Sequence, residues 1–234
     1  MRRLVVLCAC LAVVGCGESG KSSYTAADVK AAYYTARDGG ADKLQSYFVD
    51  EDYHSHSNYV PIGGLEVCPL AQRASYDAAR VENMIEPKAA QPVRQFIVEP
   101  KADDDDRTPK ITQGALVFGT GSIASDGMRA VGSGMTKCPA TYEVRSGPSP
   151  ILGTYRVSAR PIESGEWKGV MQQIAHTYPA GQDDVYYEDL AHVVVQHANV
   201  ILYLDVTHRK VIGERSDAAT IAESALRTVL KRLG

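Results

Sequence analysis

The chain has 234 residues and a formal net charge of −3 at pH 7, and hydrophobic residues make up 44% of it. This small negative charge excludes nucleic acid and anionic membrane surfaces as partners implied by electrostatics. The length suits one large domain or two small ones.

The first sixteen residues have the pattern of an export signal. Arg2 and Arg3 precede an uncharged run at residues 4–14. That run is too short to span a bilayer core of about 30 Å, which needs roughly 20 residues. The following Val-Val-Gly-Cys resembles the lipobox of bacterial lipoproteins, in which the cysteine, here Cys16, is acylated and becomes the new N-terminus. We therefore expect residues 1–15 to be removed, residues 16–24 to form a flexible tether and residues 25–234 to form a domain.

The same region permits a rival interpretation as a nucleotide site. The stretch that begins at Gly15 and ends at Ser22 fits the P-loop pattern G-x-x-x-x-G-K-[ST], and Asp205 ends an apolar run as a Walker-B aspartate does. However, a P-loop helix begins at the Lys-Ser pair. Here the helix signal starts later, with Thr25 as N-cap and Asp28 three residues on. The P-loop is therefore a remote alternative.

Cysteine usage agrees with export. Cys8 and Cys10 leave with the signal and Cys16 carries lipid, so Cys68 and Cys138 form an even pair. Two such cysteines in an oxidising compartment usually form a disulfide, which we expect here. Two buried thiols or a redox pair are the alternatives, although no C-x-x-C motif supports the redox pair.

The first half of the domain mixes helices and strands. A helix is expected at residues 26–36, ended by two glycines, and a short helical turn at 41–48. Beyond these come an irregular stretch at 50–61, a helix at 70–85 with a shift into strand near its end left open, a strand at 93–99, an acidic loop at 101–110 and a strand at 111–120.

The second half is dominated by strands. Ala124, Met128, Val131 and Met135 predict a helix whose glycines bring it close to the sheet. Strands are expected at 140–145, 151–162, 166–178, 192–196 and 200–207, and a final helix near 218–233.

Two details of the second half are predicted more closely. Residues 197–199 form a hairpin turn in which Asn199 takes a positive φ, and the run 200–204, apolar on both faces, is a central strand. Ser216 caps the last helix, whose apolar stripe packs on the sheet, and Lys231 and Arg232 favour its C-terminus. The order of elements indicates an α+β fold, a mostly antiparallel sheet covered by helices in a single domain after the signal peptide.

The second half resembles a family of actinobacterial lipoproteins and the extracellular sensor domain of mycobacterial PknH-type Ser/Thr kinases. The resemblance is carried by a helix that ends at Cys138, the hairpin turn at Asn199 and the C-terminal helix. It implies a domain that senses a ligand or partner outside the membrane, with no catalytic residues to transfer. The kinase domains contain more cysteines than this chain.

Motifs that carry chemistry are weak. His54 and His56 make an H-x-H pair in an irregular loop, which is more often a polar loop than a metal site. The aspartates at 103–106 lack the spacing of a calcium loop. His192 and His197 near the hairpin tip are interpreted as solvent-facing strand residues, and Trp167 as a core or sheet-edge residue. We expect no catalytic residue, no metal and no cofactor.

The sequence thus predicts a lipid-anchored extracytoplasmic protein with a non-catalytic, ligand-binding or partner-binding domain. The expected partners are the membrane, through the lipid anchor, and an unknown small ligand or envelope protein, with no nucleic acid. A carrier of a lipid or other hydrophobic ligand is the main alternative, and it would need a deep apolar cavity between sheet and helices.

Overall fold

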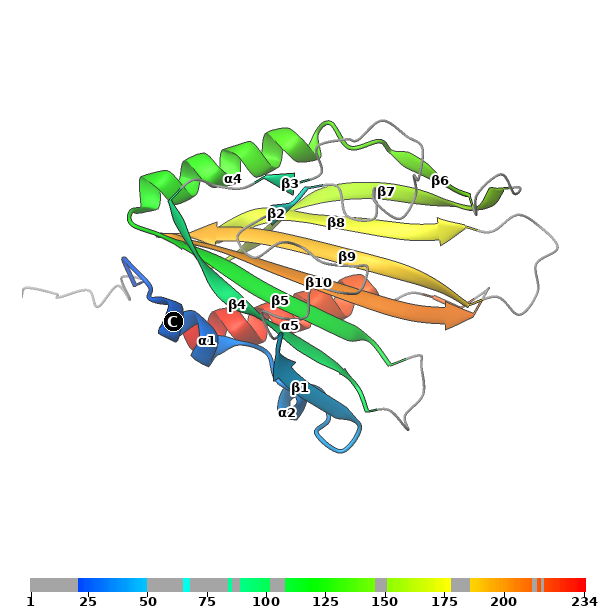
Figure 1. Ribbon diagram of the computed structural model, residues 1–234, viewed down its shortest axis with the longest axis horizontal. Coiled ribbons are helices and arrows are strands. Elements are labelled where there is room, and N and C mark those ends of the chain that lie inside the picture. Colours follow the sequence, from blue (N-terminus) through cyan, green and yellow to red (C-terminus); the bar gives the residue numbers. More distant parts are fainter. Residues whose placement is uncertain are drawn as a thin grey trace, which may run out of the picture.

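An eight-stranded antiparallel sheet forms the middle layer of the protein (Figure 1). The computed structural model describes residues 21–49, 65–67, 84–85, 89–101, 108–145, 151–177, 186–211, 214–215 and 217–234. Across the sheet the strands are ordered β1-β4-β5-β10-β9-β8-β7-β6. Every neighbouring pair in this order is antiparallel. Strand β10 is inserted between β5 and β9, and so joins the first strands of the chain to the later ones.

The strands of this sheet are β1 (Leu44–Phe48), β4 (Ala90–Pro100), β5 (Lys110–Phe118), β6 (Thr141–Arg145), β7 (Ile151–Ser164), β8 (Trp167–Thr177), β9 (Tyr186–His197) and β10 (Val200–Val211). A separate pair is formed by β2 (Leu65–Glu66) and β3 (Met84–Ile85). The helices are α1 (Ala26–Ala32), α2 (Ala36–Gly39), α4 (Gly121–Met135) and α5 (Ala218–Leu233).

Helices cover both faces of the sheet. Helices α1, α2 and α5 pack on one side, which we call the α5 face, and α4 packs on the other, the α4 face (Figure 1). Because side chains alternate along a strand, each central strand sends one set of residues into each core. This arrangement confirms the expected α+β fold.

The prediction that residues 200–204 form a central strand is confirmed. Strand β10 pairs with β5 on one edge and β9 on the other, so that Tyr203 lies opposite Gly114 and Val194. Both edges are therefore occupied, and the run at 4–14 has no place beside β10 as a P-loop strand. Asp205 lies in the middle of β10 instead of at its end. Strand β10 thus provides neither the strand neighbour nor the terminal aspartate that the P-loop alternative needs, and residues 15–20 of its motif lie outside the described residues.

The first predicted helix is shorter than expected. Thr25 and Asp28 form the predicted capping box, but α1 ends at Ala32. The chain is extended at Tyr33, with φ −52° and ψ 144°, and a second capping box, between Thr35 and Asp38, starts α2. Periodicity alone continued the helix to Ala36 because that residue lies on the same buried stripe.

The short helical turn expected at residues 41–48 is wrong, because residues 44–48 form the edge strand β1. Its register places Leu44 opposite Pro100 and Phe48 opposite Phe96. The phenylalanine rings meet edge to face at 4.7 Å between centroids, and Tyr33 stacks on Phe96. A strand of five residues gives a weak periodic signal, and pairing with β4 decides its conformation.

The hairpin between β9 and β10 forms where predicted, but a different residue bears the positive φ. Ala198 has φ 46°, whereas Asn199 is buried and uses its amide to hold other segments. Asparagine tolerates the left-handed region well, which made it the natural choice from sequence. Here its amide forms hydrogen bonds with three backbone groups, and Ala198 adopts the positive φ of the turn instead.

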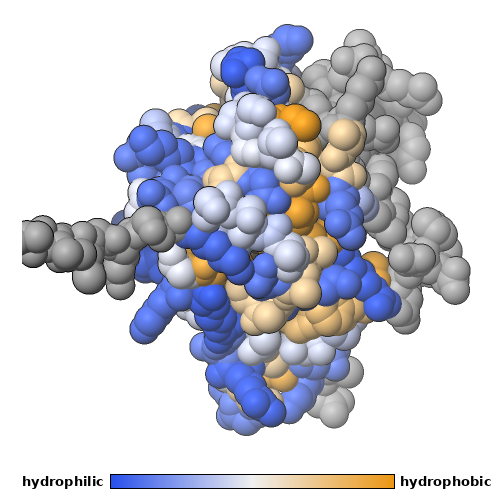
Figure 2. All heavy atoms as spheres, turned by 90° about the vertical axis from the view of Figure 1, so that its left-hand side faces the viewer, coloured by the Kyte–Doolittle hydropathy of each residue, from blue (hydrophilic) through white to orange (hydrophobic). Residues whose placement is uncertain are grey.

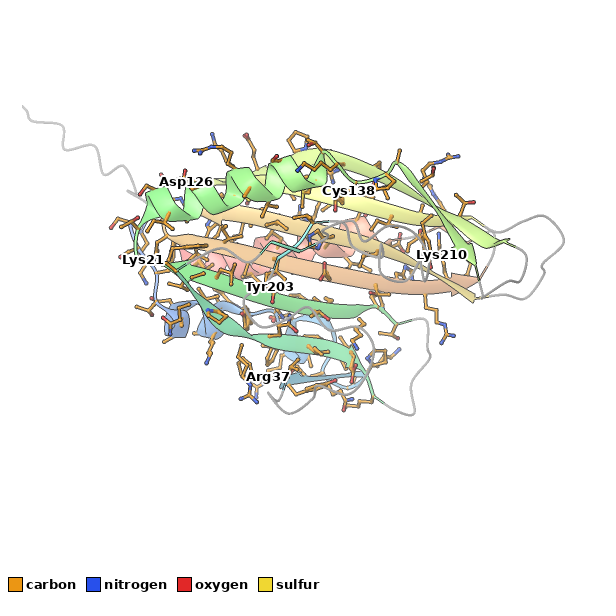
Figure 3. The ribbon with its side chains drawn as sticks, turned by 45° about the horizontal axis from the view of Figure 1, so that its top comes forward. Lys21, Arg37, Asp126, Cys138, Tyr203 and Lys210 are labelled. Atoms are coloured by element: carbon orange, nitrogen blue, oxygen red, sulfur yellow. The ribbon has the colours of Figure 1, made fainter. Side chains whose placement is uncertain are left out.

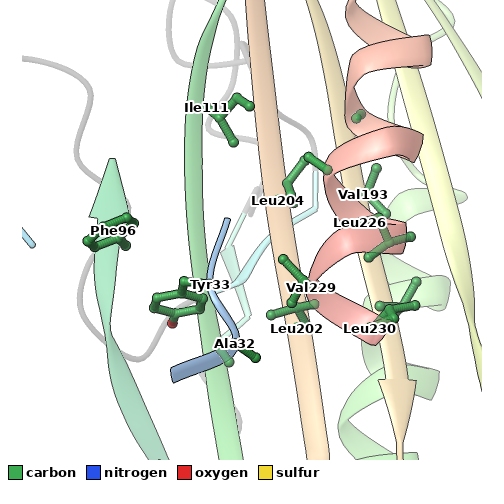
Figure 4. Packing of buried hydrophobic residues seen from close by; sticks show 14 of the residues in the cluster. Ala32, Tyr33, Phe96, Ile111, Val193, Leu202, Leu204, Leu226, Val229 and Leu230 are labelled. Carbon is green, nitrogen blue, oxygen red and sulfur yellow. The ribbon is translucent and has the colours of Figure 1, made fainter. Parts of the chain in front are cut away.

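The apolar stripe of the last helix packs on the sheet as predicted (Figure 4). Leu226, Val229 and Leu230 lie among Leu202, Leu204 and other residues of the α5 face. The helix begins at Ala218, and Asp217 is its N-cap without a side-chain capping bond. The predicted cap, Ser216, lies outside the described residues.

Helix α4 confirms the helix predicted from Ala124 to Met135. A Cβ atom at Gly127 would lie 3.2 Å from Ile201 and 3.4 Å from Phe118, so this glycine permits the close approach to the sheet. The expectations for residues 50–61, for the body of the 70–85 helix and for the loop aspartates 103–106 fall outside the described residues. Within the described residues, no helix is both long and apolar enough to cross a membrane.

Candidate functional site

Of the predicted site cysteines, the structure describes Cys138. It follows the C-terminal end of α4, and its Sγ lies 3.0 Å from the carbonyl oxygen of Val67 and 3.8 Å from Nε2 of Gln172 (Figure 3). Val67 is fully buried and packs against α4 near Gly134. Cys16 and Cys68 lie outside the described residues, as do His54 and His56.

Three polar side chains lie side by side across the α4 face in a line that we call the polar row. Strand pairing places Asp205 of β10 opposite His192 of β9, and His192 opposite Gln172 of β8. Nδ1 of His192 lies 2.5 Å from Oδ1 of Asp205. His192 and Gln172 are each only 1% exposed. The expectation that His192 faces solvent is therefore wrong.

The polar row has a close His192–Asp205 contact at one end and a hydrogen bond from Gln172 to sulfur at the other. The Asp205 carboxylate orients the His192 ring, and the row continues through Gln172 to the sulfur of Cys138. Buried polar groups cost free energy unless they are paired, so a row of this kind favours one register of the strands over its neighbours. Among the described residues, no group of three His, Cys, Asp or Glu side chains is placed to hold a metal ion.

A second polar contact lies next to the row on the same face. Nε2 of Gln95 donates to the hydroxyl of Tyr203 at 2.9 Å. The Tyr203 ring lies directly over Gly114, where a Cβ atom would come within 2.2 Å of the hydroxyl oxygen. Only glycine leaves room for this ring on the sheet.

Another candidate region is the point where the N-terminal segment meets the sheet, which we call the N-terminal junction. It consists of Tyr24, Trp167, His197 and Asn199. The Tyr24 ring lies 5.7 Å from Trp167 and 5.9 Å from His197 between centroids. Trp167 is 4% exposed, so the prediction of a core or sheet-edge residue is confirmed. Burial raises the pKa of the Tyr24 hydroxyl, and the carboxylates of Glu166 and Asp28 raise it further.

An ion pair that the sequence analysis missed lies on the α5 face. Nζ of Lys210 is 2.9 Å from Oδ2 of Asp189, and each side chain is only 9% exposed. The same Nζ donates to the carbonyl oxygen of Glu214 at 3.2 Å. The ion pair could have been predicted from the hairpin register. With His197 opposite Val200, Asp189 lies opposite residue 208 and therefore next to Lys210 on the same face.

Comparisons with known proteins give a likeness of fold. No protein-family model and no curated protein sequence match the chain. The extracellular domain of PknH from Mycobacterium tuberculosis superposes with a TM-score of 0.51 and 14% identity, covering 91% of this chain and 100% of that chain. LpqN, described as involved in cell envelope biogenesis of the same organism, has a TM-score of 0.25 and 13% identity, covering 84% of this chain and 94% of that chain.

An uncharacterized protein from Mycobacterium smegmatis has a TM-score of 0.35 and 10% identity over 91% of this chain and 98% of that chain. At these identities the similarity establishes fold and no more, and of these three structures the PknH domain, with its TM-score of 0.51, supports it. The predicted resemblance to PknH-type extracellular domains is thus confirmed as a shared fold, over almost the whole chain and not only the second half.

Proposed function

We propose that this chain is a lipid-anchored extracytoplasmic protein whose single α+β domain binds an envelope partner or a small ligand and catalyses no reaction. The observation that carries the proposal is the fold shared with the extracellular domain of PknH, which spans 91% of this chain. Its sheet is covered by helices on both faces, and Nδ1 of the buried His192 is paired with the carboxylate of Asp205. The predicted lipobox at Cys16 supports the location.

The lipid anchor is tested by intact mass and membrane partitioning of the native protein, with Cys16→Ala as the matched control. We expect a mass that lacks residues 1–15 and includes acyl chains, and recovery of the protein in the detergent phase. Both features should disappear in the variant, because the thiol of Cys16 is the acylated atom. An uncleaved protein that stays in the aqueous phase would contradict the anchor.

A disulfide between Cys68 and Cys138 belongs to the same proposal. Its support is the position of Cys138 Sγ, 3.0 Å from the carbonyl of Val67, the residue that precedes Cys68 in the chain. Closing a loop of about 70 residues would stabilise the fold by roughly 4 kcal/mol in the chain-entropy model. Mass spectrometry of the alkylated protein before and after reduction counts the thiols, and Cys138→Ser is the control. Alkylation of both cysteines without reduction would contradict the bond.

The binding role is distinguished from a carrier role by what accompanies the purified protein. A carrier should release a hydrophobic compound on organic extraction, whereas a sensor domain should release none beyond its own acyl chains. No observation on the described residues favours the carrier of a hydrophobic ligand, which stays a prediction of the sequence.

A further inference from the structure

The chain is fixed to the end of the sheet at Tyr24. The amide of Asn199 accepts from the backbone N–H of Tyr24 at 2.7 Å and donates to its carbonyl at 3.0 Å. The same amide donates to the carbonyl of Phe118 at 2.9 Å. Tyr24 is 3% exposed and packs on Trp167. The residues before Tyr24 therefore leave the protein from one defined point at this end.

The segment that follows Tyr24 is held as firmly. The amide of Gln113, which is fully buried, binds the backbone N–H of Tyr34 at 2.9 Å and its carbonyl at 2.7 Å. Arg232 of α5 donates to the carbonyl of Tyr33 at 2.7 Å. Three side chains from different elements thus hold the segment, so a pull on the N-terminus is transmitted to the sheet and not absorbed by unfolding of α1.

The surface around this exit point, which we call the anchor end, carries the exposed Glu166 in its β7–β8 turn and the Lys21–Asp28 ion pair beside the exit, and the rest of its loops are uncharged. It includes the β5–α4 connection with the first turn of α4, the β7–β8 turn and the β9–β10 turn, with residues Gly119, Thr120, Gly121, Ser122, Ile123, Ser164, Gly165 and Ala198. Ile123 is 38% exposed, one of two large hydrophobic side chains so exposed among the described residues. Figure 2 looks onto this end and shows a band of apolar and weakly polar residues between hydrophilic flanks.

The length of the tether limits which part of the domain can face the membrane. Eight residues, from Cys16 to Ser23, precede Tyr24. Fully extended they reach at most about 28 Å, and as a flexible coil about 15 Å. Strand β10 has 12 residues, so the sheet is about 36 Å long between the ends marked by Lys21 and Lys210 in Figure 3. The tether is thus too short for the domain to stand with its Lys210 end on the bilayer.

We propose that the anchor end is the surface of this domain that meets the lipid bilayer, with the sheet upright and the Lys210 end presented outward. The inference rests on the proposed lipid anchor at Cys16. The occupant of the surface is the headgroup layer of the lipids, since the eight-residue tether holds this end nearest the bilayer and the charged and polar groups of the surface stay hydrated among headgroups. The Tyr24–Asn199 contact fixes the point at which the tether joins the domain, and this fixed point sets the orientation of the domain.

The position of the sole tryptophan makes this orientation measurable. Trp167 lies in the N-terminal junction. The full-length lipidated protein is reconstituted in phosphatidylcholine vesicles with a dansyl acceptor on a fraction of the headgroups, and energy transfer from tryptophan is recorded. The matched variant is Trp167→Phe with Ala175→Trp, which moves the donor along β8 by about 26 Å to an exposed position. We expect a large loss of donor emission for Trp167 and a much smaller loss for the variant.

Equal transfer from the two positions, as a domain lying on its side would give, or stronger transfer from position 175, would overturn the inference. Absence of both proteins from the vesicles, together with Cys16→Ala behaving like wild type, would instead refute the anchor itself. Inserting a Gly/Ser segment between Ser22 and Ser23 provides a second variant that leaves the domain unchanged. The longer tether should reduce the transfer from Trp167 toward that of position 175, and unchanged transfer would show that the end adheres to lipid on its own.

Discussion

The hairpin of β9 and β10 has two faces of different character. On the α5 face every position from residue 191 to 195 and from 200 to 206 is Ala, Val or Leu, and all are buried. On the α4 face the same strands alternate apolar residues with His192, Tyr203 and Asp205. One pair of strands therefore supplies a purely apolar core on one side and a buried polar row on the other.

The apolar packing on one face and the polar row on the other constrain the fold in different ways. Apolar packing is tolerant of shape and supplies most of the stabilisation, whereas a buried polar pair is favourable only with its partner in place. A slip of the hairpin by one residue would turn His192 toward α5 and leave Asp205 unpaired. At these positions the α5 face thus contributes apolar packing alone, whereas the α4 face adds to its own apolar cluster a penalty for the wrong register.

The largest effect should come from a truncation on the apolar face. Leu204→Ala removes a side chain that is 1% exposed, between α5 and the sheet. We expect a loss of about 3 kcal/mol in the free energy of unfolding, because a cavity is left in a packed core. Urea denaturation measures it, with Ser224→Ala at an exposed position of α5 as the control, expected within about 0.5 kcal/mol of wild type. A similar cost for both would mean that α5 is not firmly packed.

The second prediction concerns the Lys210–Asp189 ion pair, which lies on the α5 face beyond its apolar positions. Lys210→Met removes the ammonium that lies 2.9 Å from the buried Asp189 carboxylate, and should cost about 3 kcal/mol. Adding Asp189→Leu should recover most of that loss, because two apolar side chains need no partner. Denaturation of the single and double variants decides it. If the double variant were as unstable as the single one, the free energy lost would not come from the uncompensated Asp189 charge, and this expectation would be wrong.

The polar row is tested by a double-mutant cycle of His192→Ala and Asp205→Asn. We expect a coupling free energy of about 1.5 kcal/mol, since a hydrogen bond to a charged group is lost in either single variant. Thr112→Val is the control, because Thr112 of β5 lies opposite Asp205 and the substitution alters a neighbouring polar side chain without removing the His192–Asp205 contact. Additive effects of the two substitutions would indicate that the pair contributes to packing only.

The smallest effect is expected at the rim of the α5 face, where Asp38 binds Arg232. Burial raises the pKa of Asp38, but hydrogen bonds from Arg232 and Thr35 outweigh it and hold the pKa below its usual value. The lowered pKa means that the stabilisation is complete above about pH 4 and is lost as pH falls through the folded-state pKa. Asp38→Asn should therefore be less stable than wild type at pH 6, and the difference should shrink below pH 4. A constant difference across unfolding curves at pH 6, 4 and 3 would contradict the assignment.

Elements with strong periodic or capping signals could be predicted from local sequence. The capping box at Thr25, the glycine-containing helix that ends before Cys138, the central strand 200–204 and the final amphipathic helix were all predicted. Each depends on residues within one or two turns of helix or within one strand. Local spacing is therefore sufficient, and the α+β class follows from their order.

Tertiary structure alone decided the features that depend on distant partners. Strand β1 forms because it pairs with β4. Helix α1 ends early because the Gln113 side chain binds the backbone of Tyr34. Ala198 has the positive φ because Asn199 is held by Tyr24. His192 is buried because Asp205 and Gln172 lie beside it. These contacts join residues separated by 13 to 175 positions along the chain. No local pattern encodes them, since their free energy appears only when the sheet has assembled.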